Sequence, residues 1–186
     1  MRKRSRISVT GIIAAVHTHR SFADVRVLMD LHSVETSRTR QRSIRNAAAV
    51  MLVAHWESFV ENIFEYCVRK HYADQSVETQ NAIIKSTANR FHSASSADVN
   101  KLFLNVGVAN ILDSVRWPGM SSTRAKRKID DIVNARHFIA HGQRHTRESS
   151  YPTTAKLKDW IAFIDEAGDL IAAAVQSKLE GKVPNG

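Results

Sequence analysis

The residues best suited to chemistry occupy nine consecutive positions, Asn134-Ala135-Arg136-His137-Phe138-Ile139-Ala140-His141-Gly142. An imidazole titrates near neutral pH, so a histidine here would be able to take up and release protons. A guanidinium stays charged and can bind two phosphate oxygens at once. Cleavage of a phosphodiester by the 2′-OH of RNA requires proton transfers and stabilisation of a charged phosphorane. Arg136 and His141 supply groups for both tasks.

The spacing of these residues decides whether one helix can bring them together. Arg136 and His141 are five positions apart, so on an ideal α-helix their side chains point ~140° apart. We expect Gly142 to end the helix and so to let the His141 ring swing. By contrast, Asn134, His137 and His141 are spaced to share one face.

Two other interpretations of the same residues stay open. Cations are favoured at the C-terminus of a helix, so Arg136 and His141 could serve only as helix-capping residues. His137 and His141 also have the i, i+4 spacing of two zinc ligands, with His145 further along. A third ligand would have to come from beyond Gly142, no Glu follows the first His, and no carboxylate cluster is evident. We therefore expect no metal and no other cofactor.

The charge balance indicates the kind of partner. Lys and Arg number 27 against 18 Asp and Glu, which gives a net charge of +9. Such a surplus favours a polyanion, either nucleic acid or an anionic membrane face. Basic residues cluster at Arg38, Arg40, Arg42 and Arg45, and again near the candidate helix. The residues predicted to bind RNA are Arg124, Lys126, Arg127, Lys128 and Arg144.

Membrane and disulfide chemistry are both disfavoured. No apolar run approaches the ~20 residues of a membrane span, and the stretch at 11–16 is too short for a signal-peptide core. Cys67 is the single cysteine, so no intrachain disulfide and no cysteine-based zinc cluster can form. We expect a cytoplasmic protein with no membrane partner.

Periodicity predicts an all-α fold. Gly and Pro number only seven and three, and apolar residues recur at helical spacing. Long helices are predicted at about 22–32, 40–72, 121–141 and 154–179, with short ones at about 80–91 and 98–106. Ser21 and residues 121–123 offer caps. The chain is predicted to be one domain over 1–186, with a flexible basic segment at 1–18 and a tail at 181–186. Trp117, beside Pro118, is a candidate for stacking on a nucleobase.

The candidate helix resembles the signature of the HEPN superfamily, which is Arg, four to six residues, then His. Arg136 and His141 match it with four residues between them, and His137 takes the position after the Arg that is usually polar. The ending Ile139-Ala140-His141-Gly142 is similar to the RiboL-PSP branch of that superfamily. So is Ala54-His55-Trp56-Glu57-Ser58-Phe59-Val60 in the long second helix.

This resemblance implies a HEPN-like bundle of four main helices with additional short ones. It implies a homodimer in which two Arg/His helices meet and form one RNA cleft. The implied activity is metal-independent RNA cleavage by Arg136, His141 and His137, with Glu57 orienting Arg136 or His141. Relatives commonly act as toxins or phage-defence effectors, which implies an antitoxin or other regulatory partner. The alternatives are a non-catalytic module that binds RNA or a protein, and an accessory subunit restrained by an antitoxin.

Overall fold

The computed structural model describes residues 22–88, 91, 93–141 and 151–180. These residues form helices and no strand, so the predicted all-α class is confirmed. Arg144, His145, the segment 1–18 and the tail 181–186 lie outside the described residues. The helices are α2 (Ala23–Val34), α3 (Arg38–His71), α4 (Val77–Ala88), α5 (Ser96–Leu104), α6 (Ile111–Ser114), α7 (Ser122–His141) and α8 (Thr154–Glu180).

Helix α3 is the central element of the bundle. It packs against α2, α4, α5, α7 and α8. Its buried side carries residues such as Leu52, Trp56, Ile63 and Cys67, which recur at helical spacing and are almost fully excluded from solvent. The 34 residues of α3 contain no Gly or Pro, so nothing interrupts it. Burial raises the pKa of the Cys67 thiol to about 12, so this cysteine is a core residue and not a reactive one.

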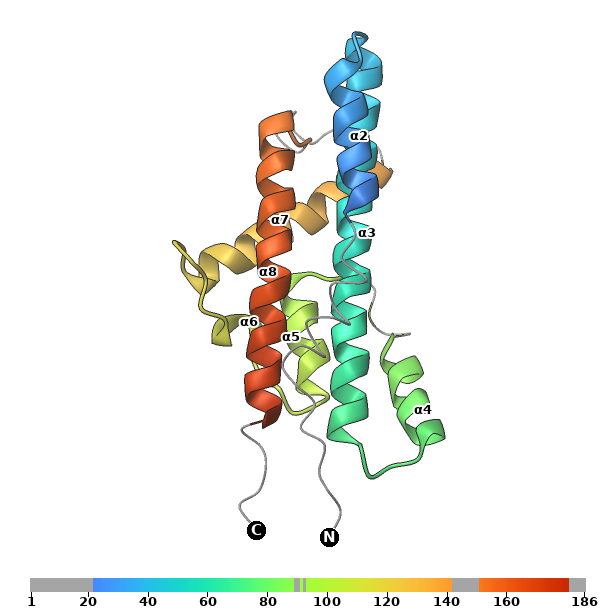
Figure 1. The fold of residues 1–186 in the computed structure, drawn as a ribbon, viewed down its shortest axis with the longest axis vertical. Helices are drawn as coiled ribbons and strands as arrows, with labels where there is room; N and C mark the ends of the chain where they lie inside the picture. The colour runs from blue at the N-terminus through green and yellow to red at the C-terminus, as the bar shows by residue number, and fades with distance from the viewer. Residues whose placement is uncertain (1–21, 89–90, 92, 142–150, 181–186) are drawn as a thin grey trace.

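Three of the long helices, α2, α3 and α8, lie along one axis of the bundle. In Figure 1, α3 and α8 lie side by side and both run from the top of the molecule to the bottom, while α2 runs the opposite way beside α3. The four main helices predicted from periodicity correspond to α2, α3, α7 and α8. Their bounds agree with the predicted ones to within about two residues.

The region between α3 and α7 departs more from expectation. Helix α4 begins three residues earlier than predicted, and α5 begins at Ser96 because Ser95 is its N-cap, whose Oγ accepts the Asp98 N–H. The single-turn helix α6 was not predicted. It follows Asn110, which has a φ of 50° in the left-handed region that Asn tolerates.

Helix α7 crosses the other long helices at a steep angle, with its C-terminal end toward α3 (Figure 1). The predicted cap at its start is confirmed at Ser121, whose Oγ accepts the Arg124 N–H at 3.2 Å. Its inner side is made by Ala125, Ile129, Ile132 and Val133, all buried. Burial of this side fixes the rotation of α7 and hence the direction of every later side chain on it.

The described helices do not include a membrane span. None of them combines the length and the apolar character that crossing a bilayer requires.

Candidate functional site

Arg136 is held by an ion pair with Glu57. Its Nη1 donates to Glu57 Oε1 at 2.7 Å, which joins α7 to the middle of α3. The Glu57 side chain is 19% exposed and that of Arg136 is 41% exposed. One face of the guanidinium therefore rests on the bundle while part of it still reaches solvent. The structure pairs Glu57 with Arg136, one of the two residues that Glu57 was expected to orient.

Glu57 lies beside the loop before α5. The neighbouring indole of Trp56 donates to the Ala94 carbonyl at 2.8 Å, and the backbone N–H of Ala94 favours the charged form of Glu57. Trp56 and Ala94 are fully buried. Two adjacent residues of α3 thus interact with one residue in that loop. This arrangement gives Trp56-Glu57 a physical role in placing Arg136.

The carboxyl group of Glu57 has a raised pKa. Burial is the largest cause, because removal from water disfavours the charged form. The Arg136 guanidinium opposes this effect, the nearby Glu61 carboxylate adds to it, and the Ala94 N–H opposes it. Ionised Glu57 is thus costly in this position, and Arg136 offsets that cost only in part.

His137 and His141 form a second cluster on the outside of α7. Their ring centroids lie 4.4 Å apart with the planes inclined at 53°, and both residues are exposed. Asn134, also exposed, lies on the same face, as the spacing predicted. The site therefore presents two adjacent imidazoles to solvent.

Within one chain, Arg136 and His141 are not brought together. The α-helix continues through His141, so the ~140° between the two directions on an ideal helix persists. Among the residues that the structure describes, no hydrogen bond or ion pair joins the two side chains. Arg136 faces α3, and His141 faces away with His137. The expected swing of the ring rested on Gly142, which lies outside the described residues.

The predicted RNA-binding residues of α7 divide into two kinds. Lys126 Nζ forms an ion pair with Asp113 Oδ1 at 2.6 Å, and Lys128 Nζ forms one with Asp159 Oδ2 at 2.8 Å. Lys128 also lies over the Phe163 ring, 4.7 Å from its centroid. These two lysines therefore tie α7 to α6 and α8.

Arg124 and Arg127 differ from the two lysines. Both are exposed and form no ion pair within the described ranges. They lie along the exposed side of α7 that also carries Asn134 and His137. Their charges are therefore free for a ligand.

Trp117, the candidate for stacking on a nucleobase, has structural contacts instead. Trp117 is buried, stacks on Phe163 with centroids 5.8 Å apart, and donates to the Leu112 carbonyl. Stacking of Trp117 on a nucleobase was thus a wrong prediction, because its faces are covered by the core. His55 is half-buried and meets the Phe22 ring edge-on at 5.8 Å.

Sequence reasoning missed a second tie between α7 and the Ala94 loop. Asp130 accepts the Ser96 N–H at 2.7 Å and the Ser96 hydroxyl at 2.9 Å. A carboxylate at the first turn of α5 is favoured by the helix dipole. The signal in the sequence is a pair of acidic residues between Ile129 and Ile132, which does not reveal so distant a partner.

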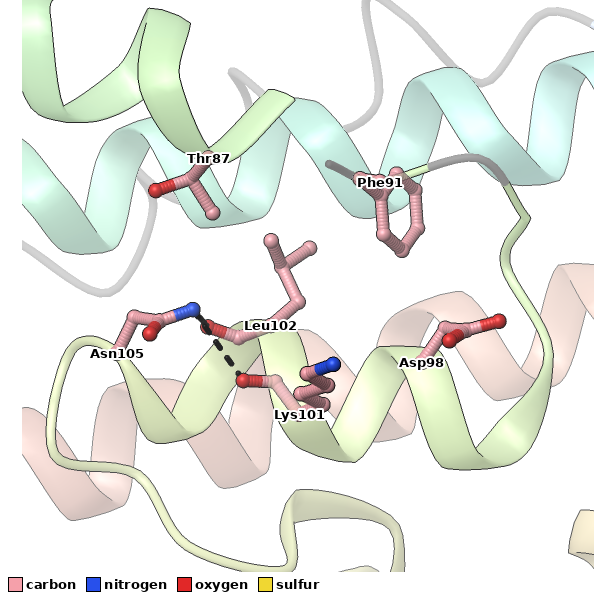
Figure 2. A pocket seen from close by; sticks show the side chains of 6 residues that line it. All are labelled: Thr87, Phe91, Asp98, Lys101, Leu102 and Asn105. Atoms are coloured by element: carbon pink, nitrogen blue, oxygen red, sulfur yellow. Dashed lines mark hydrogen bonds between the residues drawn. The ribbon is translucent and has the colours of Figure 1, made fainter. Parts of the chain in front are cut away.

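A small pocket of about 170 Å³ lies between α4 and α5, away from these residues. Figure 2 shows the side chains of Phe91 and Leu102 pointing into it, and the Asn105 amide donates to the Lys101 carbonyl below it. None of its lining residues was predicted for the site, and none contacts Arg136. The pocket therefore contributes no group to the Arg136 site.

The described residues contain no group of three or more His, Cys, Asp or Glu side chains placed to hold a metal ion. His137 and His141 supply only two such ligands. His145, the third residue of the zinc alternative, lies outside the described residues.

The chain forms an all-helical bundle in which an ion pair joins the helix that carries Arg136 and His141 to the helix that carries Trp56 and Glu57. These features define the class of domain to which it belongs. The model of the RiboL-PSP-HEPN family matches residues 24–176, and the chain belongs to that family. No curated protein and no solved structure matches it. The family connects the chain with RNA-related function.

Proposed function

We propose that this protein is a metal-independent RNA endonuclease whose site forms between two copies of the chain. The 2′-OH of RNA attacks the adjacent phosphorus, the bond from phosphorus to the 5′ oxygen breaks, and a 2′,3′-cyclic phosphate and a 5′-OH result. One imidazole takes the proton of the 2′-OH, and a second, protonated imidazole gives a proton to the 5′ oxygen. Arg136 stabilises the charge on the phosphorane.

The single observation that supports a shared site is the divergence of Arg136 and His141. The ion pair with Glu57 directs the guanidinium toward α3, whereas His141 lies on the exposed side of α7. One chain thus presents the two groups in different directions. A two-fold partner with its own α7 on the exposed face would form two equivalent sites, each with Arg136 of one chain and His141 of the other.

Each residue has a distinct role in this proposal. His141 is the acid or base, and His137 beside it is a further imidazole within reach of the same phosphate. Glu57 is a positioning residue, because it acts through Arg136. Arg124 and Arg127, with Arg144 from outside the described residues, bind RNA phosphates. Lys126 and Lys128, which were predicted to bind RNA as well, hold α7 in place through their ion pairs with Asp113 and Asp159.

We further propose that the enzyme acts in the cytoplasm as a toxin or phage-defence effector, restrained by an antitoxin or another regulatory protein. This biological role is taken from the family and not from any side chain of the described residues. A non-catalytic module that binds RNA or a protein is the alternative, and the activity of mixed variants separates the two.

The test mixes two inactive variants, Arg136→Ala and His141→Ala. If Arg136 of one chain works with His141 of its partner, the mixed dimer keeps one intact site and cleavage returns. If both groups act from the same chain, each site in the mixed dimer lacks one of them and cleavage stays absent. Light scattering on the parent checks the dimer itself. A monomeric parent would overturn the shared site, and a parent that binds RNA without cleaving it would support the binding module.

A further inference from the structure

Three arginines continue the core-facing stripe of α3 beyond the end of the core. Arg38, Arg42 and Arg45 follow the same i, i+4, i+7 spacing that places Leu52 and Trp56 inside the bundle. The stripe is therefore cationic in the first turns of α3 and apolar further along the helix. Positions on a buried stripe face neighbouring helices, so these arginines are directed toward α2 and α8 as well as toward solvent.

Arg45 has little of its hydrogen-bonding capacity in use. Its Nη1 lies 3.4 Å from Nε2 of His32, and the same imidazole nitrogen lies 3.4 Å from Thr154 Oγ1. Arg45 Nε is buried and has no hydrogen-bond partner in the described segments. A guanidinium has five N–H donors, and leaving a buried donor unpaired is costly. The cluster of Arg45, His32 and Thr154 thus has donors to spare and no carboxylate among the described residues.

The other two arginines of the stripe are exposed. Arg42 lies over the ring of Tyr151, 4.8 Å from its centroid, and Arg38 has no partner within the described ranges. Within the described part of the chain, the start of α3 has one ion pair, between Arg40 and Glu35. Lys126 and Lys128 are each paired with a carboxylate, so among the described residues the start of α3 adds a second group of unpaired arginines to Arg124 and Arg127.

The helix dipoles make this charge less favourable still. The first turns of α3 and α8 contain no acidic residue, and both helices begin at the same end of the bundle (Figure 1). Cations near the N-terminus of a helix are destabilising, because the backbone there carries partial positive charge. Arg38 lies in the first turn of α3, where this effect acts, whereas Arg42 and Arg45 lie beyond it. An anion bound beside Arg38 would offset the effect.

We infer that Arg42 and Arg45, supported by Arg38 and the Thr154 hydroxyl, form a phosphate subsite for the backbone of the RNA substrate. This inference rests on the proposed function. Arg42 precedes Glu57 by fifteen positions, which is ~22 Å along α3, and the two directions differ by only ~60°. Side chains of α3 between the two positions, such as Val53, are buried, so an RNA strand bound at Arg136 reaches the subsite over the outer surface of the bundle. About six stacked nucleotides, at ~3.4 Å each, cover that distance.

The test compares RNA binding by two double variants, in a His141→Ala background so that the RNA stays intact. R42Q/R45Q removes the subsite. K70Q/K85Q removes the same charge at the opposite end of α3 and from α4, at exposed residues. Each protein is titrated with an RNA of about twelve nucleotides and with one of about four, which is too short to span the distance.

We expect R42Q/R45Q to bind the longer RNA about tenfold more weakly, while its affinity for the short RNA changes little. The slope of log K against log salt should fall by about 1.4, or ~0.7 for each lost phosphate contact. K70Q/K85Q should match the parent on both RNAs. The subsite would be overturned if both double variants lost the same affinity for the longer RNA, or if R42Q/R45Q lost the same affinity for both RNA lengths.

Folding and the proposed function are controlled separately. Arg45 is half-buried, so Arg42→Gln alone, at an exposed position, is measured too and should show part of the loss. R42K/R45K, which keeps the charge, should recover most of the affinity. A parent that binds neither RNA sinks the proposed function and the subsite together, whereas a parent that binds while R42Q/R45Q is unchanged sinks the subsite alone. Binding of anionic lipid vesicles in preference to RNA would assign the arginines to a membrane surface instead.

Discussion

Glu57 and Arg136 lie 79 positions apart in the sequence, yet their side chains meet at 2.7 Å between α3 and α7. The pair is partly exposed, so its worth to folding is small. Its consequence is directional, because it selects one orientation for a guanidinium that otherwise has many rotamers. The backbone N–H of Ala94 favours the charged form of the same carboxylate. Glu57 thus links the position of Arg136 to the loop before α5.

Replacing Glu57 with Gln should therefore lower the cleavage rate more than it lowers RNA affinity. The amide keeps a hydrogen-bond acceptor but loses the charge that holds Arg136, and misplacement of a catalytic group costs up to about 10²-fold in rate. We expect kcat to fall about tenfold or more with KM nearly constant. Glu57→Asp should recover less than the parent rate, because its shorter side chain does not reach as far. An unchanged kcat in Glu57→Gln would contradict the positioning role.

The same substitution tests the raised pKa of Glu57. As the pH rises above 4.5, Glu57 ionises in the unfolded chain before it ionises in the folded one. Ionisation therefore stabilises the unfolded state first. The parent should therefore lose stability relative to Glu57→Gln as pH rises from below 4.5 to the folded-state pKa, and the difference should then become constant. Urea unfolding of both proteins across this range measures it. A relative gain by the parent over the same range would mean that Arg136 outweighs burial.

The sequence was informative wherever a pattern was long or local. The 34 residues of α3 and the 27 of α8 carry enough periodic apolar positions to fix their ends, and Ser121 is a local cap. The four-residue helix α6 is too short to show any period. The site residues could be proposed, and Glu57 was expected to orient Arg136 or His141, but only the fold selects Arg136.

Charge was the property that sequence predicted least well. Lys126 and Lys128 belong to a basic cluster in the sequence because Asp113 and Asp159 are 13 and 31 positions away from them. Their neutralisation depends on how α7 crosses α6 and α8, which no local pattern encodes. Conversely, Arg42 belongs to a cluster visible in the sequence, and its uncompensated state became evident only in the fold.

Replacing His141 with Ala should abolish cleavage and leave RNA binding nearly intact. A general acid or base is worth about 10²- to 10⁴-fold in rate, whereas a neutral imidazole adds little to phosphate binding. His141 is exposed and its loss affects only the last turn of α7, so the free energy of unfolding should change by about 1 kcal/mol or less. His137→Ala is the matched control on the same face of α7, and it should lower the cleavage rate less than His141→Ala does. Full activity in His141→Ala would end the catalytic interpretation.

Cleavage should persist in excess chelator. The proposed proton transfers and charge stabilisation use His141, His137 and Arg136 alone, and the products should carry 2′,3′-cyclic phosphate ends. Mass spectrometry of a defined RNA after incubation with EDTA checks both points. Loss of activity that zinc restores would instead favour a metal bound by His137 and His141, and the same restoration in His137→Ala would contradict that interpretation in turn.

The basic residues of α7 should separate into a stabilising pair and a binding pair. Lys126→Gln with Lys128→Gln removes two ion pairs, each worth ~0.2–1 kcal/mol, and the contact of Lys128 with Phe163. For a chain of this size that loss lowers Tm by roughly 2–4 °C per kcal/mol. Arg124→Gln with Arg127→Gln removes the same charge without an ion pair, so Tm should stay constant while RNA affinity and its salt slope fall. Thermal unfolding and RNA titration of both variants give the comparison. If the arginine variant binds RNA as the parent does and the lysine variant does not, the RNA path follows the other side of α7 and the outward face loses its role in binding.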